Sequence, residues 1–176
     1  MNENRKPLSI KRGLVGSGLA RIIIIELAGE PKGKGRPRFV RSTGHVYTPT
    51  ETRQYENALR SVAESVMGRA KPLDGPLSVT IDALFPIPQS WSRLKWQRAV
   101  RGEILPTSRP DADNLMKMLD SFNGVVWHDD RQIVTAFIRK RYSNKPALVI
   151  KIVPEDTHGI LFDAHSAHEI PSLQVA

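Results

Sequence analysis

Two pairs of aspartates lie within twenty residues of one another in a chain that is otherwise basic. Asp111 and Asp113 form one pair, Asp129 and Asp130 form a second, and Lys117 lies between the pairs. Carboxylates crowded in this way repel one another unless a cation lies between them. Oxygen ligands suit Mg²⁺, which keeps several waters and is often held by a substrate phosphate as well. The residue types therefore predict a magnesium site built from both aspartate pairs.

The backbone around the first pair predicts how its side chains are aimed. Pro110 has a fixed φ and disfavours helix at Arg109, so we expect an extended approach to Asp111. Side chains two residues apart share a side on an extended backbone but diverge by roughly 200° on a helix. A helix should begin near Asp113 and carry Lys117 one turn later. Its spacing predicts a buried stripe of Leu115, Met118, Leu119 and Phe122.

The segment after this helix should bring in the second pair. Asn123–Gly124 is typical of a helix end, and Val125–Trp127 should return the chain so that the second pair approaches the first. Each carboxylate also has an ordinary structural explanation. Asp113 can cap the helix, Asp111 can pair with Arg109, and the second pair can form a turn.

Two basic segments precede the aspartates. The first is a loop interrupted by glycine and proline, with the basic side chains Lys32, Lys34, Arg36, Arg38 and Arg41. Such a loop can follow a phosphate backbone with little base specificity, although a solvated run of charge is the alternative. The second is a short helix, capped by Ser90, that should carry Arg93 and Lys95 toward DNA. Trp91 and Trp96 either pack in the core or contact DNA.

The charge of the chain is unevenly distributed. The net charge is +8, but residues 155–176 contain four acidic and no basic side chains, so the first 154 residues carry about +12. A field of that sign attracts polyanions such as DNA. The absence of cysteine excludes disulfides and thiolate sites. The apolar run at 22–25 is far shorter than the roughly 20 residues of a membrane span, so we expect no membrane segment, no export and a cytoplasmic location.

The remaining pattern predicts a small α+β domain over residues 21–154. Outside the segment that carries the two aspartate pairs, the expected elements are a hairpin over 39–47, a helix over 50–67, and four strands. The strands are expected over 21–28, 77–85, 132–142 and 147–153. The last two strands should form an antiparallel pair, giving a mixed or antiparallel sheet packed against two main helices. We expect residues 1–20 to be a flexible basic arm and residues 155–176 to be a poorly ordered acidic tail.

One residue pattern runs through all these segments. It reads Arg109-Pro-Asp-x-Asp-Asn-Leu-x-Lys117, then Leu119-Asp120, Asn123-Gly124-Val-Val and Asp129-Asp-x-Gln-Ile133. The basic loop ending at Arg38, Tyr47-Thr-Pro49 and Pro88-x-Ser-Trp91 belong to the same pattern. Over about residues 22–153 the chain resembles the RusA family of Holliday junction resolvases, particularly its phage-type members.

The resemblance implies a homodimer that nicks branched DNA, above all four-way junctions, in a bacterial or phage-infected cell. The implied cofactor is Mg²⁺, with Mn²⁺ as a substitute, and the implied products carry 5′-phosphates. By position, the catalytic residues of the family match Asp111, Asp113, Lys117 and Asp130. Asp129 matches an accessory acidic position, Asn114 a supporting one, and we add Arg109 to the expected DNA contacts.

Three other functions stay open at this point. A nuclease of the same chemistry could act on flaps or forks instead of four-way junctions. A junction-binding protein could keep the fold without cleaving DNA, although the full set of aspartates and Lys117 speaks against it. A small-molecule phosphohydrolase would not need so basic a chain.

Overall fold

The computed structural model describes residues 22–35, 38–40 and 45–155, and for residues 38–40 and 45–47 the backbone only. The arm predicted over residues 1–20 and nearly all of the tail predicted over 155–176 lie outside the described residues. Arg36 and Arg41 of the basic loop lie outside them as well.

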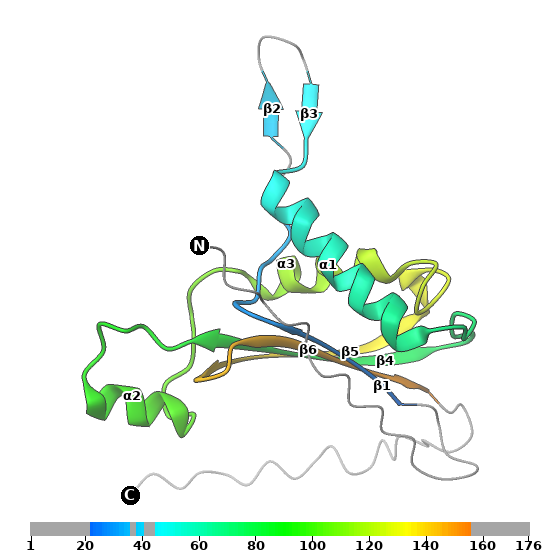
Figure 1. The fold of residues 1–176 in the computed structure, drawn as a ribbon. Helices are drawn as coiled ribbons and strands as arrows, with labels where there is room; N and C mark the ends of the chain where they lie inside the picture. Colours follow the sequence, from blue (N-terminus) through cyan, green and yellow to red (C-terminus); the bar gives the residue numbers. More distant parts are fainter. Residues whose placement is uncertain (1–21, 36–37, 41–44, 156–176) are drawn as a thin grey trace, which may run out of the picture.

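A four-stranded mixed sheet forms the framework of the domain. Its strand order is β1 (Ile23–Ala28), β6 (Ala147–Pro154), β4 (Leu77–Pro86) and β5 (Ile133–Ser143). β6 pairs antiparallel with both β1 and β4, whereas β4 and β5 are parallel. The predicted α+β class and mixed sheet are therefore confirmed (Figure 1).

The predicted antiparallel pairing of the last two strands is wrong. Both strands exist, but β4 lies between them, so that Ile81 faces Ile150 on one side and Ile138 on the other. β4 buries every second side chain completely or almost completely, and a strand that is this apolar on its core face is best placed inside the sheet. Residues 144–146 therefore join two strands that flank a third, instead of closing a hairpin.

One face of the sheet is covered by helices, as Figure 1 shows. The longest is α1 (Thr50–Met67), which has the predicted bounds, ends at Gly68 and buries Leu59 and Ala63. Beside it, α3 (Ala112–Met116) continues into the 3₁₀ helix η1 (Lys117–Phe122). The predicted stripe is confirmed, because its four members are all buried: Leu115, Met118, Leu119 and Phe122.

Three further elements lie outside this core. The predicted hairpin is present as β2 (Arg38–Val40) and β3 (His45–Tyr47), which project beyond the start of α1 (Figure 1). The basic helix α2 (Arg93–Val100) follows β4. Its cap is Ser92 rather than the predicted Ser90, because the Ser92 hydroxyl accepts the Lys95 amide at 3.4 Å. No helix within the described residues is long and apolar enough to cross a membrane.

Candidate functional site

The first aspartate pair lies where an extended segment enters α3. Asp111 has extended backbone (φ −70°, ψ 156°) and Asp113 is the second residue of the helix, as predicted. Both side chains are exposed, and Asp111 makes no capping hydrogen bond. Lys117 Nζ donates to Asp113 Oδ2 at 2.7 Å, one helical turn away. Residues 111–117 therefore present two carboxylates and one ammonium group to solvent. We call this segment the acidic turn.

The basic loop before α1 is bonded directly to this acidic turn. The Lys34 amide donates to the Asn114 carbonyl oxygen at 2.8 Å. The Lys34 ammonium lies 2.8 Å from Asp120 and 3.3 Å from Glu56, and the hydrogen bond to Asp120 raises the pKa of Lys34 above its ordinary value. Lys34, predicted as a DNA contact, thus already joins the loop to both η1 and α1.

Close packing also holds the loop against the turn. A Cβ atom at Gly33 would lie 2.6 Å from the Pro110 Cβ and 2.9 Å from the Asn114 Cβ. Glycine is therefore required here for the approach of two backbones. The sequence did not predict Gly33 as a site residue, because nothing local marks a glycine that packs against a segment about eighty residues away.

Replacing Gly33 with alanine should loosen the acidic turn. Relieving the clash requires a backbone shift, and overpacking of this kind costs about 1–3 kcal/mol. We expect a lower free energy of unfolding in urea and a slower rate of the DNA cleavage that the sequence resemblance implies. The matched control is Gly29→Ala in the same loop, where the added Cβ meets nothing within 4 Å and only the positive φ of 107° is strained. Cleavage that falls equally in both variants would contradict a specific contact.

Lys140 holds the acidic turn from the other side. Its ammonium donates to the carbonyl oxygens of Ser108 and Pro110, the latter at 3.0 Å, and so ties β5 to the residues just before Asp111. It also lies 5.5 Å from the centre of the Phe85 ring. A contact between residues thirty apart leaves no local signal, so the sequence alone does not predict this role of Lys140.

Replacing Lys140 with methionine should misplace Asp111 while preserving most of the aliphatic stem. Hydrogen bonds to a charged group contribute about 1.5–3 kcal/mol, so we expect a similar loss of stability and a slower cleavage rate. Lys140→Arg should restore part of both. The control is Lys151→Met on an exposed position of β6. Wild-type cleavage by Lys140→Met, measured on the folded protein, would remove its positioning role.

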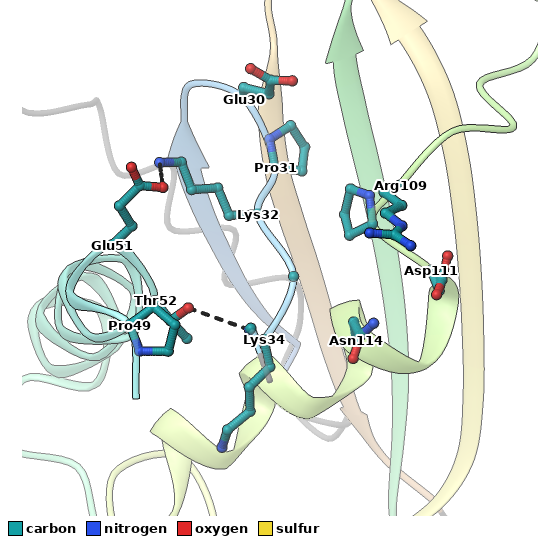
Figure 2. A pocket seen from close by; sticks show the side chains of 13 residues that line it. Glu30, Pro31, Lys32, Lys34, Pro49, Glu51, Thr52, Arg109, Asp111 and Asn114 are labelled. Carbon is teal, nitrogen blue, oxygen red and sulfur yellow. Dashed lines mark hydrogen bonds and ion pairs between the residues drawn. The ribbon is translucent and has the colours of Figure 1, made fainter. Parts of the chain in front are cut away.

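An open hollow of about 740 Å³ separates the basic loop from the acidic turn. Figure 2 shows Lys32 and Lys34 on one wall and Arg109, Asp111 and Asn114 on the other. Lys32 is only loosely paired, with its Nζ 3.6 Å from an exposed Glu51 carboxylate. Cations thus lie on both walls of the hollow, which also carries three acidic side chains: Glu30, Glu51 and Asp111.

The second aspartate pair has a structural role of its own. Asp129 caps the short 3₁₀ helix η2 (Asp130–Gln132), accepting from the Arg131 amide at 3.0 Å and from its Nε at 2.8 Å. The backbone bond, and then the side-chain bond, lowers the pKa of Asp129 below its ordinary value. The Gln132 side chain closes the cap by accepting the Asp129 amide. Asp130 is exposed.

The two pairs lie toward opposite ends of β5. Lys140 contacts the residues before Asp111, whereas Asp130 lies three residues before the start of β5 at Ile133. At about 3.3 Å per strand residue, the seven steps from Ile133 to Lys140 span roughly 23 Å. No group of three or more acidic or histidine side chains that could hold a metal occurs within the described ranges. The prediction that one chain brings both pairs together is therefore wrong.

The first pair alone fits a magnesium ion that also binds substrate. Mg²⁺ is commonly held by one or two carboxylates, with waters and substrate phosphates completing its octahedron. Asp111 and Asp113 supply two exposed carboxylates, and Asp111 lines an open hollow that Lys32 and Arg109 also line. The two carboxylates of one chain therefore fit an ion whose other ligands are waters and substrate phosphates. They are too few for an ion that is held by protein groups alone.

Comparison with known proteins gives two matches. The family model described as "Endodeoxyribonuclease RusA" matches residues 28–153. The chain is also 31% identical over 129 residues to the uncharacterized protein YqaN of Bacillus subtilis strain 168. The aligned region covers 70% of this chain and 90% of that protein. The family match includes α1, β4, the acidic turn, β5 and all but the last residue of β6.

Proposed function

The chain belongs to the RusA family of endodeoxyribonucleases, and from that premise we propose that it resolves four-way DNA junctions by Mg²⁺-dependent nicking. The observation that carries this proposal is the exposed trio of Asp111, Asp113 and Lys117, with Asp111 lining a hollow that Lys32 and Arg109 also line. Mn²⁺ should substitute for Mg²⁺. The products should carry 5′-phosphate and 3′-hydroxyl ends.

The residues of the acidic turn have distinct roles in this proposal. Asp111 and Asp113 hold the ion, which when bound supplies Lewis-acid chemistry that activates a water and neutralises charge on the phosphate. Lys117 is a compact cation 2.7 Å from Asp113, so it can contact the scissile phosphate or the charge that develops on it. Asn114 supports the turn, since its carbonyl oxygen accepts the Lys34 amide.

The basic residues divide into contacts and supports. Lys32 and Arg109 are exposed on the two walls of the hollow and are proposed to bind phosphates. Arg36, Arg38 and Arg41, whose side chains lie outside the described part of the structure, are proposed as further DNA contacts from the sequence alone. Lys34 acts mainly as a positioning residue, because its ammonium already pairs with two carboxylates. Arg93 and Lys95 are proposed to contact a more distant part of the DNA.

We further propose that Asp130 completes the metal site of a second copy of the chain. Within one chain Asp130 lies at the far end of β5 from Asp111, so a shared ion requires two subunits. β5 is one of the two edge strands of the sheet, and its Val134 and Phe137 side chains are 62% and 60% exposed. Antiparallel pairing of two β5 strands about a two-fold axis would place the start of one beside the end of the other.

Such a dimer explains paired cleavage. A two-fold dimer carries two equivalent sites, and a four-way junction has two-fold symmetry of its own. Two strands of like polarity would therefore be cut at symmetric positions. Asp129, whose side chain already caps η2, would act as an accessory residue that orients Asp130.

The experiment that tests this function uses end-labelled DNA of three shapes. A four-way junction, a replication fork and a linear duplex of the same sequence are incubated with protein in Mg²⁺, Mn²⁺ or EDTA. We expect symmetric nicks in the junction with either metal, none with EDTA and none in the duplex. Preferential cutting of the fork would identify a flap or fork nuclease, and binding without cutting in any metal would identify a junction-binding protein.

A further inference from the structure

Helix α2 carries exposed apolar side chains on a strongly basic background. Leu94, Trp96 and Val100 are 66%, 38% and 46% exposed, and Ala99 is the only buried residue of the helix. Arg93, Trp96 and Val100 follow one another at spacings of three and four residues, which places them in one stripe along the helix. We call these three residues the α2 stripe.

The base of α2 is firmly attached to the domain. Trp91 packs edge-on against the Tyr142 ring of β5 at a centroid distance of 5.1 Å, and the Lys95 ammonium lies 3.9 Å from the centre of the Trp91 ring. At the other end, Glu103 pairs with Arg98 and Arg101 at 3.1 and 2.6 Å. Trp91 is thus a half-buried anchor, whereas Trp96 is held outward.

The α2 stripe lies at the same end of the sheet as the acidic turn. Tyr142, which anchors Trp91, is two residues from Lys140, and Lys140 binds the carbonyl oxygen of Pro110 next to Asp111. Residues 101–110 also join α2 directly to that turn. A DNA strand held at the acidic turn would therefore pass close to α2.

The charge of the helix indicates which partner fits the stripe. Residues 93–100 include Arg93, Lys95 and Arg98 and no acidic residue. The cores of protein–protein interfaces are depleted of lysine and of charged residues other than arginine, whereas nucleic-acid surfaces combine both cations with aromatic rings on which bases stack. The composition of α2 therefore favours nucleic acid over a second protein surface.

We propose that the α2 stripe stacks against bases exposed at the branch point of a DNA junction, with Trp96 as the stacking side chain and Arg93 beside it for the adjacent phosphate. Continuous duplex offers no exposed base face, so the stripe would contribute to selectivity for branched DNA. The inference rests on the proposed function, because it assumes that branched DNA is bound at the acidic turn.

The test measures DNA binding without cleavage, in EDTA, using a four-way junction with 2-aminopurine at the branch point. The 2-aminopurine is placed next to the base that Trp96 would contact, and its fluorescence should rise with wild-type protein because it loses that base as a stacking neighbour without itself contacting the indole. Trp96→Ala should weaken junction binding about tenfold or more, leave duplex binding unchanged and reduce the fluorescence change. Trp96→Phe should retain most of the wild-type affinity. Leu94→Ala, an exposed apolar residue off the stripe, should behave as wild type.

The outcomes separate this inference from the proposed function. Junction binding and cleavage by wild-type protein with no change in Trp96→Ala would overturn the stacking role alone. Failure of wild-type protein to bind or cut junctions would overturn the proposed function as well. Loss of dimers in Trp96→Ala, measured by light scattering on protein with an unchanged circular dichroism spectrum, would show that the stripe contacts a second copy and would overturn the inference.

Discussion

Replacing Asp113 with asparagine should abolish cleavage of a four-way junction and leave junction binding intact. Asparagine keeps the shape of the side chain but removes the charge that would help to hold a cation. Metal-assisted stabilisation of a transition state is worth several kcal/mol, so the cleavage rate should fall by roughly 10³-fold or more. Binding should be equal or tighter, because one negative charge is removed from the DNA side of the protein.

The fold should tolerate this change. Asp113 is exposed, and its pair with Lys117 is an exposed contact between residues four apart on a helix. Such pairs contribute at most about 1 kcal/mol. Glu64→Gln is the matched control, since Glu64 forms the equivalent exposed pair with Arg60 on α1. Undiminished cutting by Asp113→Asn, or an equal loss in Glu64→Gln, would contradict the assignment of Asp113.

The second large effect is the recovery of cleavage activity in mixed dimers of two variants that are inactive alone. Asp113→Asn and Asp130→Asn should each be inactive alone. If each site takes Asp111 and Asp113 from one subunit and Asp130 from the other, a mixed dimer contains one intact site. Random exchange of equal amounts should restore about one quarter of the wild-type sites. Nicking of one strand is the measurement, because paired cutting needs two intact sites.

The control for this experiment mixes two variants with damage in the same pair. Asp111→Asn and Asp113→Asn should not restore each other, because every site in their mixed dimer lacks one of the two carboxylates. Exchange is verified by a size tag on one partner. Absence of recovery from Asp113→Asn with Asp130→Asn, in verified mixed dimers, would refute the shared site.

Local patterns in the sequence predicted the elements well. The bounds of α1 follow from an uninterrupted apolar periodicity that ends at Gly68. The buried stripe from Leu115 to Phe122 follows from the same spacing, although η1 tightens it into a 3₁₀ helix. The extended approach to Asp111 follows from Pro110. Each of these features depends on interactions within a few residues.

The errors concern interactions between distant segments. A short connection predicted a hairpin of β5 and β6, but burial of the alternating side chains of β4 places that strand between them. The separation of the aspartate pairs follows from the same sheet order, because it fixes where β5 begins and ends. The contacts of Gly33 with Pro110 and of Lys140 with Ser108 likewise arise only when the sheet and the turn are packed together.

The most direct test of the central claim is cleavage of a supercoiled plasmid that extrudes a cruciform. Such a plasmid carries one four-way junction in otherwise continuous duplex, so one gel reports both structure dependence and paired cutting. In Mg²⁺ the protein should convert the plasmid to linear DNA cut at the cruciform, and EDTA should prevent this. Nicked circles without linear product, cutting of the relaxed plasmid at the same rate, or cleavage in EDTA would contradict a metal-dependent resolvase.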